Sequence, residues 1–278
     1  MATISTTTSA ALPAVNVAAT GKAYFLTDNN KFVVNTGSAW IEVHSDGTGA
    51  AAFENRWGMD TGRLDVGTST DFTFSTNGFT ISMWFKSNKT TGIQSAIFDF
   101  RPGTTTAPML WMTSSQLKFH NGSYQGTPTY TPSLNWRHLV VTNDGSQTSI
   151  YLDDLTTALD TRSDTADYSS NNLTIGSHNN NTSSGYFFPG IIDEVSIFNS
   201  TSSLTSVEAL ASGGKPADLS SYDPVAWYRM GDDSNDSPVA AGNITGITDS
   251  SGNGNDATTN ATSQPTFSAL ASSETIYV

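Results

Sequence analysis

The chain has 278 residues, of which 13% are charged, and its excess of Asp and Glu gives a net charge of -13. The 12 Lys and Arg residues are too few for a phosphate-binding surface, so we expect no nucleic-acid partner. The absence of cysteine excludes disulfides and thiolate metal sites, which leaves an ordinary hydrophobic core to stabilise the fold.

The N-terminal segment is rich in Ala, Thr and Ser and too poor in apolar residues for a core, which predicts an extended arm over residues 1–20. It has no basic residue before Lys22 and no long apolar run, so it lacks the pattern of a secretory signal. No later segment is apolar enough to span a bilayer, and we expect no membrane insertion.

Three short β-prone runs follow, and they predict a β meander over residues 21–45. The runs are AYFLT, KFVVN and AWIEV. This stretch resembles the small β modules near the N-termini of tailed-phage fibre and appendage proteins, and the resemblance implies an attachment module.

Strand-like runs then recur at short spacing from Arg63 to Ile197, with turn signals such as NDGS and HNGS between them. This pattern predicts an all-β sandwich. The run LTSVEALASGG, at residues 204–214, is the one segment that we predict to be helical.

Several of these segments, in their order along the chain, resemble the laminin G-like jelly roll of concanavalin type. The segments are FTISMWFKS, NWRHLVVTNDG, SIYLDD, NLTIGSHN and FFPGIIDEVSIFNSTSSLTSVEAL. The resemblance covers about residues 59–214 and implies two curved antiparallel sheets around one core. SIYLDD departs from the family pattern, because Asp154 stands where the family usually has glycine.

The run VAWYRM, at residues 225–230, and the Asp-Ser-Ser-Gly-Asn-Gly loop after it resemble the opening of the domain in many relatives. The termini of a sandwich commonly lie close together, so one edge position can be filled from either end of the chain. We therefore predict one jelly roll over residues 46–278 with a permuted closing strand at 225–230. The alternative is a truncated second domain, which the 20 residues left after Thr258 disfavour.

Alternation in GIIDEVSIF gives Asp193 the parity of Val195 and Ile197, which predicts an inward carboxylate that needs a cation or several hydrogen-bond donors. The resemblance implies a structural Ca²⁺ at such an Asp, with Asp60 or Asp65 as a partner. The loop DSSGNGNDATTN does not fit a helix-loop-helix calcium site, because Asn260 occupies its twelfth position and no helices flank it.

Aromatic side chains offer stacking platforms for a sugar. In FTISMWFKS, alternation places Phe79, Ile81, Met83 and Phe85 in the core and Trp84 on the other face, although a loop can cover such a ring. The candidate platforms are Trp84, Trp111, Tyr124 and Tyr130.

A catalytic reading has little support in the sequence. The close acid triplet of the glucanases with this fold is absent, and Asp99 and Glu194 are the outward carboxylates, on separate strands. The sequence has no Gly-x-Ser-x-Gly nucleophile elbow, so His138 has no such serine to activate. We therefore expect that the protein is not an enzyme.

These patterns lead us to expect a structural protein of a tailed-phage virion: a decoration, fibre or appendage that displays the jelly roll for adhesion or glycan binding. The expected partners are other virion proteins, further copies of the chain and a host surface glycan, and the expected location is the particle surface. The alternatives are a free bacterial carbohydrate-binding lectin module and, behind it, a glycosidase.

Overall fold

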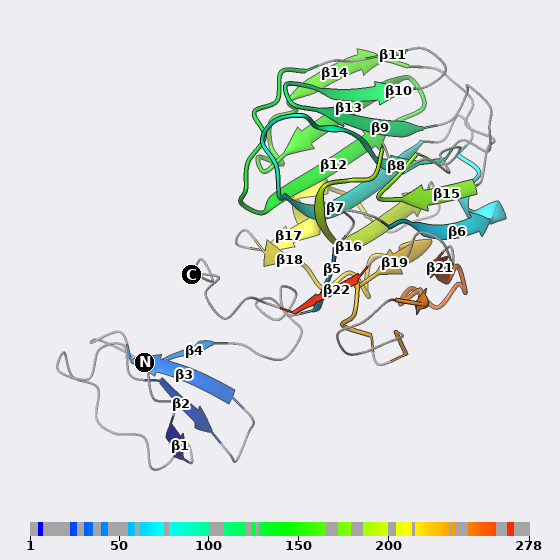
Figure 1. The fold of residues 1–278 in the computed structure, drawn as a ribbon. Helices are drawn as coiled ribbons and strands as arrows, with labels where there is room; N and C mark the ends of the chain where they lie inside the picture. The colour runs from blue at the N-terminus through cyan, green and yellow to red at the C-terminus, as the bar shows by residue number, and fades with distance from the viewer. Residues whose placement is uncertain are drawn as a thin grey trace. The chain divides into compact units, whose positions relative to one another are not determined.

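The computed structural model describes most of the chain between residues 55 and 269 and four short strands before it (Figure 1). The described ranges are 5–7, 23–26, 31–35, 40–43, 55–58, 62–74, 78–100, 108–120, 124–125, 128–164, 172–178, 186–199, 204–212, 215–233, 235–236, 244–259 and 266–269. The first five of these, 124–125 and 266–269 are described as backbone alone. Among all these residues, no helix is long and apolar enough to cross a membrane.

The chain divides into two compact units, Met1–Ala52 with Thr275–Val278, and Phe53–Glu274. The first unit holds a four-stranded sheet in the order β1-β2-β3-β4. Its strands are β1 (Ser5–Thr7), β2 (Ala23–Leu26), β3 (Lys31–Asn35) and β4 (Trp40–Val43). The last three form the antiparallel meander, and β1 pairs with β2 in parallel, so a segment that we predicted as an arm contributes a strand.

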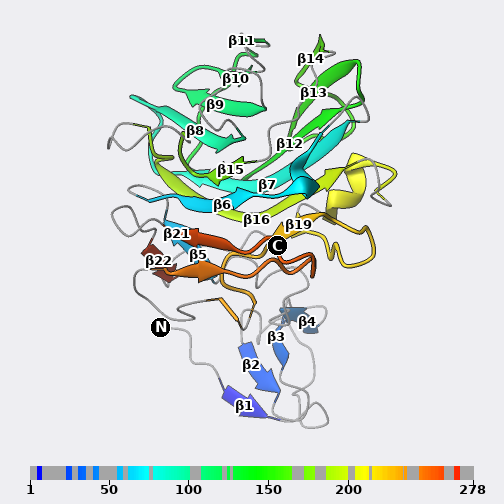
Figure 2. The same cartoon turned by 90° about the vertical axis from the view of Figure 1, so that its right-hand side faces the viewer.

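The second unit is a sandwich of two sheets, seen edge-on in Figure 2. The first, called the β9 sheet, has the order β11-β10-β9-β8-β15-β6-β21-β20. Its strands are β11 (Tyr124–Gln125), β10 (Leu117–His120), β9 (Met109–Thr113), β8 (Gln94–Asp99), β15 (Asn172–Ile175), β6 (Leu64–Thr68), β21 (Ala257–Thr259) and β20 (Gly246–Ile247).

The second sheet, called the β7 sheet, has the order β14-β13-β12-β7-β16-β5-β22, and β19 also pairs with β16. Its strands are β14 (Asp160–Ser163), β13 (Gln147–Leu152), β12 (Arg137–Asn143), β7 (Phe79–Ser87), β16 (Gly190–Asn199), β5 (Asn55–Gly58), β22 (Thr266–Ala269) and β19 (Ala226–Tyr228). All the strand pairs within the two sheets are antiparallel. The prediction of an all-β sandwich of two antiparallel sheets is therefore confirmed.

The main core lies between the two sheets and is built by alternation along the strands. In β7, Phe79, Ile81, Met83 and Phe85 are each at most 3% exposed and belong to this core, as predicted. The C-terminal segment contributes to both sheets, because β19 pairs with β16, β21 with β6 and β22 with β5. The first and last strands of the second unit are thus neighbours.

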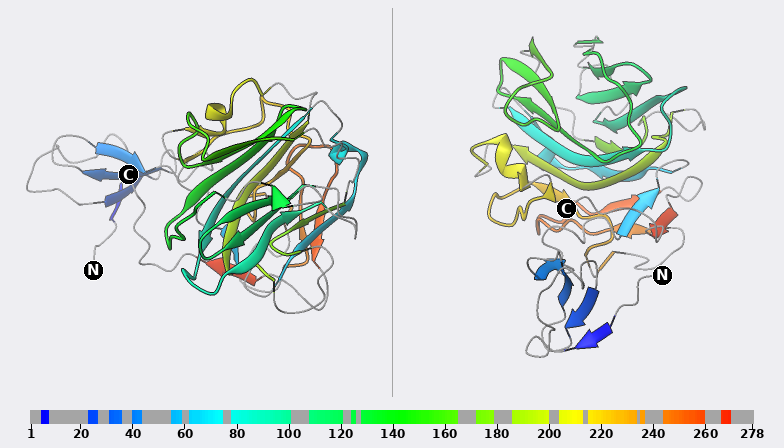
Figure 3. Two further views of the ribbon diagram at one scale, coloured as in Figure 1. Left: turned by 90° about the horizontal axis from the view of Figure 1, so that it is seen from above. Right: turned by 90° about the vertical axis from the view of Figure 1, so that its left-hand side faces the viewer.

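A second apolar cluster covers the β7 sheet on the side away from the main core. Val140 and Phe198 of the sheet pack there against Leu210 and Leu219, which lie on the connection between β16 and β19. Figure 3 shows this connection, in yellow, lying against the β7 sheet.

The predicted helix at residues 204–214 is wrong: the described part of this segment forms one 3₁₀ turn, η5 (Val207–Leu210). Ser206 caps the turn by accepting a hydrogen bond from the Glu208 backbone N–H, and the chain is extended again at Ala211. The strands β17 (Ala211–Ser212) and β18 (Lys215–Pro216) follow. The physical reason is that this short segment gains more from burying Leu210 on the sheet than from helical hydrogen bonds.

Asp193 is buried, as predicted, at 1% exposed, but the prediction that it points into the main core is wrong, because β16 contains a β-bulge. Ile192 pairs with Phe85 and Asp193 with Trp84, but the next pair is Ser196 with Ser82, so β16 has one residue more than β7. Glu194 takes a positive φ of 47° within this irregularity. The extra residue breaks the parity between Asp193 and Val195 and places Asp193 on the face of Trp84, away from the main core.

Candidate functional site

The outer face of the β9 sheet is the face turned away from the main core, and Trp111 stands on it. Leu110 and Met112 are fully buried in the core, so alternation along β9 turns Trp111 outward. Its register partners are Ala96 of β8 and Lys118 of β10. The Trp111 ring is half-buried, so part of it is open to a ligand.

Two further rings surround Trp111. The Tyr186 ring lies 5.1 Å from the Trp111 ring, between centroids, at 58°, and Tyr186 is 41% exposed. His178 meets Trp111 edge-on at 6.3 Å. His178 and Tyr186 both lie on the connection between β15 and β16, far from Trp111 in sequence, so the tertiary structure brings these three residues together. The group of Trp111, Tyr186 and His178 is called the aromatic cluster below.

Polar groups border the aromatic cluster on the same face. The His178 Nδ1 atom lies 3.7 Å from the Asp99 carboxylate, which is completely buried. Asp99 pairs across the sheet with Thr174, and Thr174 with Asp65. Asp65 in turn forms an ion pair of 3.0 Å with Arg63. The polar row therefore runs across β8, β15 and β6.

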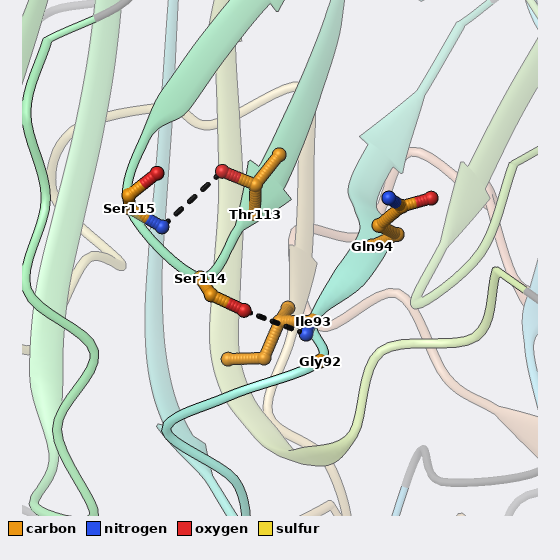
Figure 4. Close-up of a pocket in the computed structure, with 6 residues that line it drawn as sticks. All are labelled: Gly92, Ile93, Gln94, Thr113, Ser114 and Ser115. Carbon is orange, nitrogen blue, oxygen red and sulfur yellow. Dashed lines mark hydrogen bonds between the residues drawn. The ribbon is translucent and has the colours of Figure 1, made fainter.

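An open depression of about 420 Å³ lies at the ends of β8 and β9 (Figure 4). Its lining residues are Gly92, Ile93, Gln94, Thr113, Ser114 and Ser115. Two backbone N–H groups fix its shape: Ile93 donates to the Ser114 Oγ at 2.9 Å, and Ser115 donates to the Thr113 Oγ1 at 3.3 Å. The lining is therefore largely polar. The hydrogen bond from Ile93 to Ser114 joins the segment before β8 to the segment after β9.

Trp84 is placed very differently from Trp111. It lies on the outer face of the β7 sheet, stacked on the His138 ring at 4.5 Å and 3°, and it is 7% exposed. The His138 Nε2 atom shares a hydrogen bond of 2.8 Å with the Ser82 Oγ. Burial lowers the pKa of His138 to about 4, so the ring is neutral at pH 7. Trp84 therefore contributes to packing in the free protein.

The two predicted tyrosine platforms also differ from Trp111. Tyr130 is 2% exposed and belongs to the main core, where it contacts Phe85, and burial raises the pKa of its phenol. Tyr124 lies in β11, and its side chain is outside the described residues. Trp111 is thus the predicted platform that the structure shows on an open face.

The predicted calcium ligands do not come together in the described residues. Asp193 lies on the outer face of the β7 sheet and Asp65 on the outer face of the β9 sheet, while Asp60 is outside the described residues. Calcium takes six to eight oxygen ligands, and within the described part of the chain no three acidic or histidine side chains are grouped to hold a metal. A Ca²⁺ at Asp193 stays a prediction, which the effect of a chelator on thermal unfolding tests.

Asp249, in the loop after β20, uses its carboxylate to bind backbone N–H groups. Its Oδ1 accepts hydrogen bonds from the backbone N–H groups of Trp227 and Ser251, and its Oδ2 from that of Asn255. The Tyr228 hydroxyl donates to the Asn255 carbonyl at 2.7 Å. These contacts attach the loop to β19, so the carboxylate serves the fold.

Glu194 lies with Trp227 and Arg229 beside the bulge in β16. The Trp227 Nε1 donates to its carboxylate at 2.7 Å, and Arg229 lies 3.4 Å from it. Burial raises the pKa of Glu194 to about 7, although Arg229 and the indole N–H act in the opposite direction. Glu194 and Asp99 belong to different sheets and point away from each other, so they do not flank one substrate bond.

Tyr186 and His178 were not among the site residues predicted from the sequence. Alternation in YFFPG would have grouped Tyr186 with Phe188, two residues later, which is fully buried in the core, so this pattern could not have indicated an outward Tyr186. No pattern in the sequence indicates that His178 and Trp111 meet.

The comparisons with known proteins agree on the fold. The family model described as the concanavalin A-like lectin/glucanases superfamily matches residues 60–208, which is more than half of the chain. The search of the curated proteins gave no match.

One of the similar solved structures shares the architecture at low sequence identity. A protein from Bacteroides ovatus ATCC 8483, described as a "putative carbohydrate binding protein", is 16% identical with a TM-score of 0.58, and the alignment covers 93% of this chain and 72% of that one. Domain 4 of the extracellular arabinanase AbnA from Geobacillus stearothermophilus, in complex with arabinotriose, is also 16% identical, with a TM-score of 0.35 over 49% of this chain and 64% of that one. Mouse laminin alpha1 domains LG4-5 are 12% identical, with a TM-score of 0.39 over 60% of this chain and 48% of that one.

Proposed function

The chain belongs to the concanavalin A-like lectin/glucanases superfamily, and from that premise we propose that it is a carbohydrate-binding protein without catalytic activity. The glycan lies on the outer face of the β9 sheet, against the aromatic cluster. The Bacteroides ovatus protein with the same fold is described in similar terms, as a carbohydrate binding protein, which supports this class of function.

The aromatic cluster is the observation that carries the proposal. Trp111 is half-buried, so its position is fixed, and Tyr186 at 41% exposure extends the apolar surface beside it. The C–H faces of a sugar ring stack on such surfaces, while nearby polar groups bond the hydroxyls. His178 supplies a polar group next to the rings, and its Nδ1 atom lies 3.7 Å from the buried Asp99 carboxylate.

The arrangement of the acids favours binding over hydrolysis. Glycoside hydrolysis uses two carboxyl groups on either side of one bond, about 5 to 10 Å apart. On the face of the aromatic cluster, Asp99 is completely buried and Asp65 is paired with Arg63. Neither carboxyl group is presented as an open acid, and Glu194 belongs to the other face.

We place this binding domain on the surface of a tailed-phage particle, where it serves adhesion to a host surface glycan. The support is the resemblance of residues 21–43 to phage attachment modules. Other virion proteins and further copies of this chain are the partners in this proposal. Mass spectrometry of purified phage particles tests it, and a free secreted lectin would instead be found only outside particles.

Affinity electrophoresis in gels that contain one polysaccharide each tests the binding function. We expect retardation by at least one of arabinan, xylan, galactan, laminarin and pullulan, and loss of that retardation in Trp111→Ala. Trp136→Ala is the matched control, since Trp136 is a half-buried tryptophan just before β12 of the other sheet. Equal retardation of Trp111→Ala and the unmodified chain would refute this site.

A further inference from the structure

The depression at the ends of β8 and β9 begins two residues along β9 from Trp111 of the aromatic cluster. Thr113 follows Trp111 by two residues on β9, so both side chains stand on the outer face. Their register partners on β8 are Gln94 and Ala96. Ala96 presents only a methyl group, so no large side chain of β8 stands opposite Trp111 between the cluster and the depression.

The lining of the depression offers neutral hydrogen-bonding groups. Gln94 and Ser115 are exposed, and they bring an amide and a hydroxyl. The Ser114 Oγ accepts from the Ile93 N–H, which leaves its own proton to donate to a ligand. None of the six lining residues is charged, in a chain whose net charge is -13. A ligand rich in hydroxyls and without charge matches this lining.

The depression is also open and firmly shaped. Gly92 has a φ of +67°, and a Cβ added there would meet no heavy atom within 4 Å. The Thr113 Oγ1 accepts hydrogen bonds from two successive backbone N–H groups, those of Ser115 and Gln116. The lining is therefore ordered before any ligand arrives, which reduces the entropy lost on binding.

We propose that this depression is a second sugar subsite, so that the ligand is a neutral oligosaccharide chain running along β8 and β9. This inference rests on the proposed function. Two residues along a strand span about 6.6 Å, which is close to the length of one sugar unit, so adjacent units of one chain fit the Trp111 surface and the depression. A monosaccharide occupies one of the two places and binds more weakly.

Calorimetric titration with oligosaccharides of one to five units tests the inference. The probes are arabino-, xylo-, laminari- and malto-oligosaccharides. We expect affinity to rise about tenfold or more from one unit to two or three, because each added hydrogen bond and each contact adds binding free energy. Gln94→Ala and Ser115→Ala should each reduce this gain about fivefold.

Gln147→Ala is the matched control for Gln94→Ala. Gln147 is also an exposed glutamine at the first position of a strand, β13, but it belongs to the other sheet. Affinity that does not depend on length, or a length gain that survives Gln94→Ala combined with Ser115→Ala, overturns the second subsite alone. Binding of no oligosaccharide, by a chain that melts cooperatively, overturns the proposed function and the subsite with it.

Discussion

The two outer faces of the sandwich carry the same kinds of residue in different surroundings. On the β7 sheet, Trp84 is stacked on His138 and is 7% exposed, and the segment with η5 covers the neighbouring apolar residues. On the β9 sheet, Trp111 stands beside Tyr186, which is 41% exposed. An outward tryptophan is therefore a binding surface only where no other segment of the chain covers it.

Removal of residues 215–278 should have the largest effect, because it alters both sheets of the sandwich. It deletes β19, β20, β21 and β22, together with Tyr228, Met230 and Ile247 of the main core. We expect loss of soluble monomer, because unpaired strands of both sheets and apolar surface become exposed. Size-exclusion chromatography measures this outcome. A soluble, cooperatively folded 1–214 fragment would show that the C-terminal strands are dispensable.

Trp84→Ala and Trp111→Ala should separate stability from binding. Loss of the buried Trp84 ring should cost about 3 to 5 kcal/mol of unfolding free energy and leave saccharide binding intact at temperatures where the chain is folded. Loss of the half-buried Trp111 should cost about 1 kcal/mol and abolish binding. Denaturant unfolding and affinity electrophoresis measure the two effects. The reverse pattern would assign the ligand to the β7 sheet.

Glu194 should make the stability of the covered face depend on pH. Its pKa is about 7 in the folded chain and 4.5 when unperturbed, so the folded chain binds this proton more tightly. The stabilising contribution of Glu194 to the unfolding free energy is therefore complete below pH 4.5 and is lost as the pH rises to about 7. The change is about 3 kcal/mol at most. Glu194→Gln should remove this decline in denaturant unfolding measured at several pH values. Glu208→Gln, at an exposed glutamate of η5, should not remove it.

His138 should have a smaller effect, of opposite sign. Its pKa falls from 6.5 to about 4 on folding, so its contribution is present above pH 6.5 and is lost as the pH falls toward 4. Between pH 6.5 and pH 5 the loss is about 2 kcal/mol. His138→Gln should therefore flatten the acid side of the stability profile, measured by thermal unfolding. An unchanged acid side would mean that His138 is protonated in the folded chain.

The order of polar and apolar residues was enough to predict most of the fold. Strict alternation in FTISMWFKS identified four core residues of β7 correctly, because side chains of a strand point to opposite faces in turn. The segments that carried the resemblance predicted the concanavalin-like sandwich. The sugar platform at Trp111 stays a prediction, and the structure places this residue outside the core.

Only the tertiary structure decided what each outward side chain meets. The bulge at Glu194 reversed the expected direction of Asp193, because one extra residue shifts the alternation and no local pattern announces it. The segment from residue 204 to 212 became a 3₁₀ turn and a short strand, since packing on the β7 sheet outweighed its helical pattern. Contact of Trp111 with His178 and Tyr186 depends on segments more than 60 residues away in sequence, and therefore on how the chain folds back on itself.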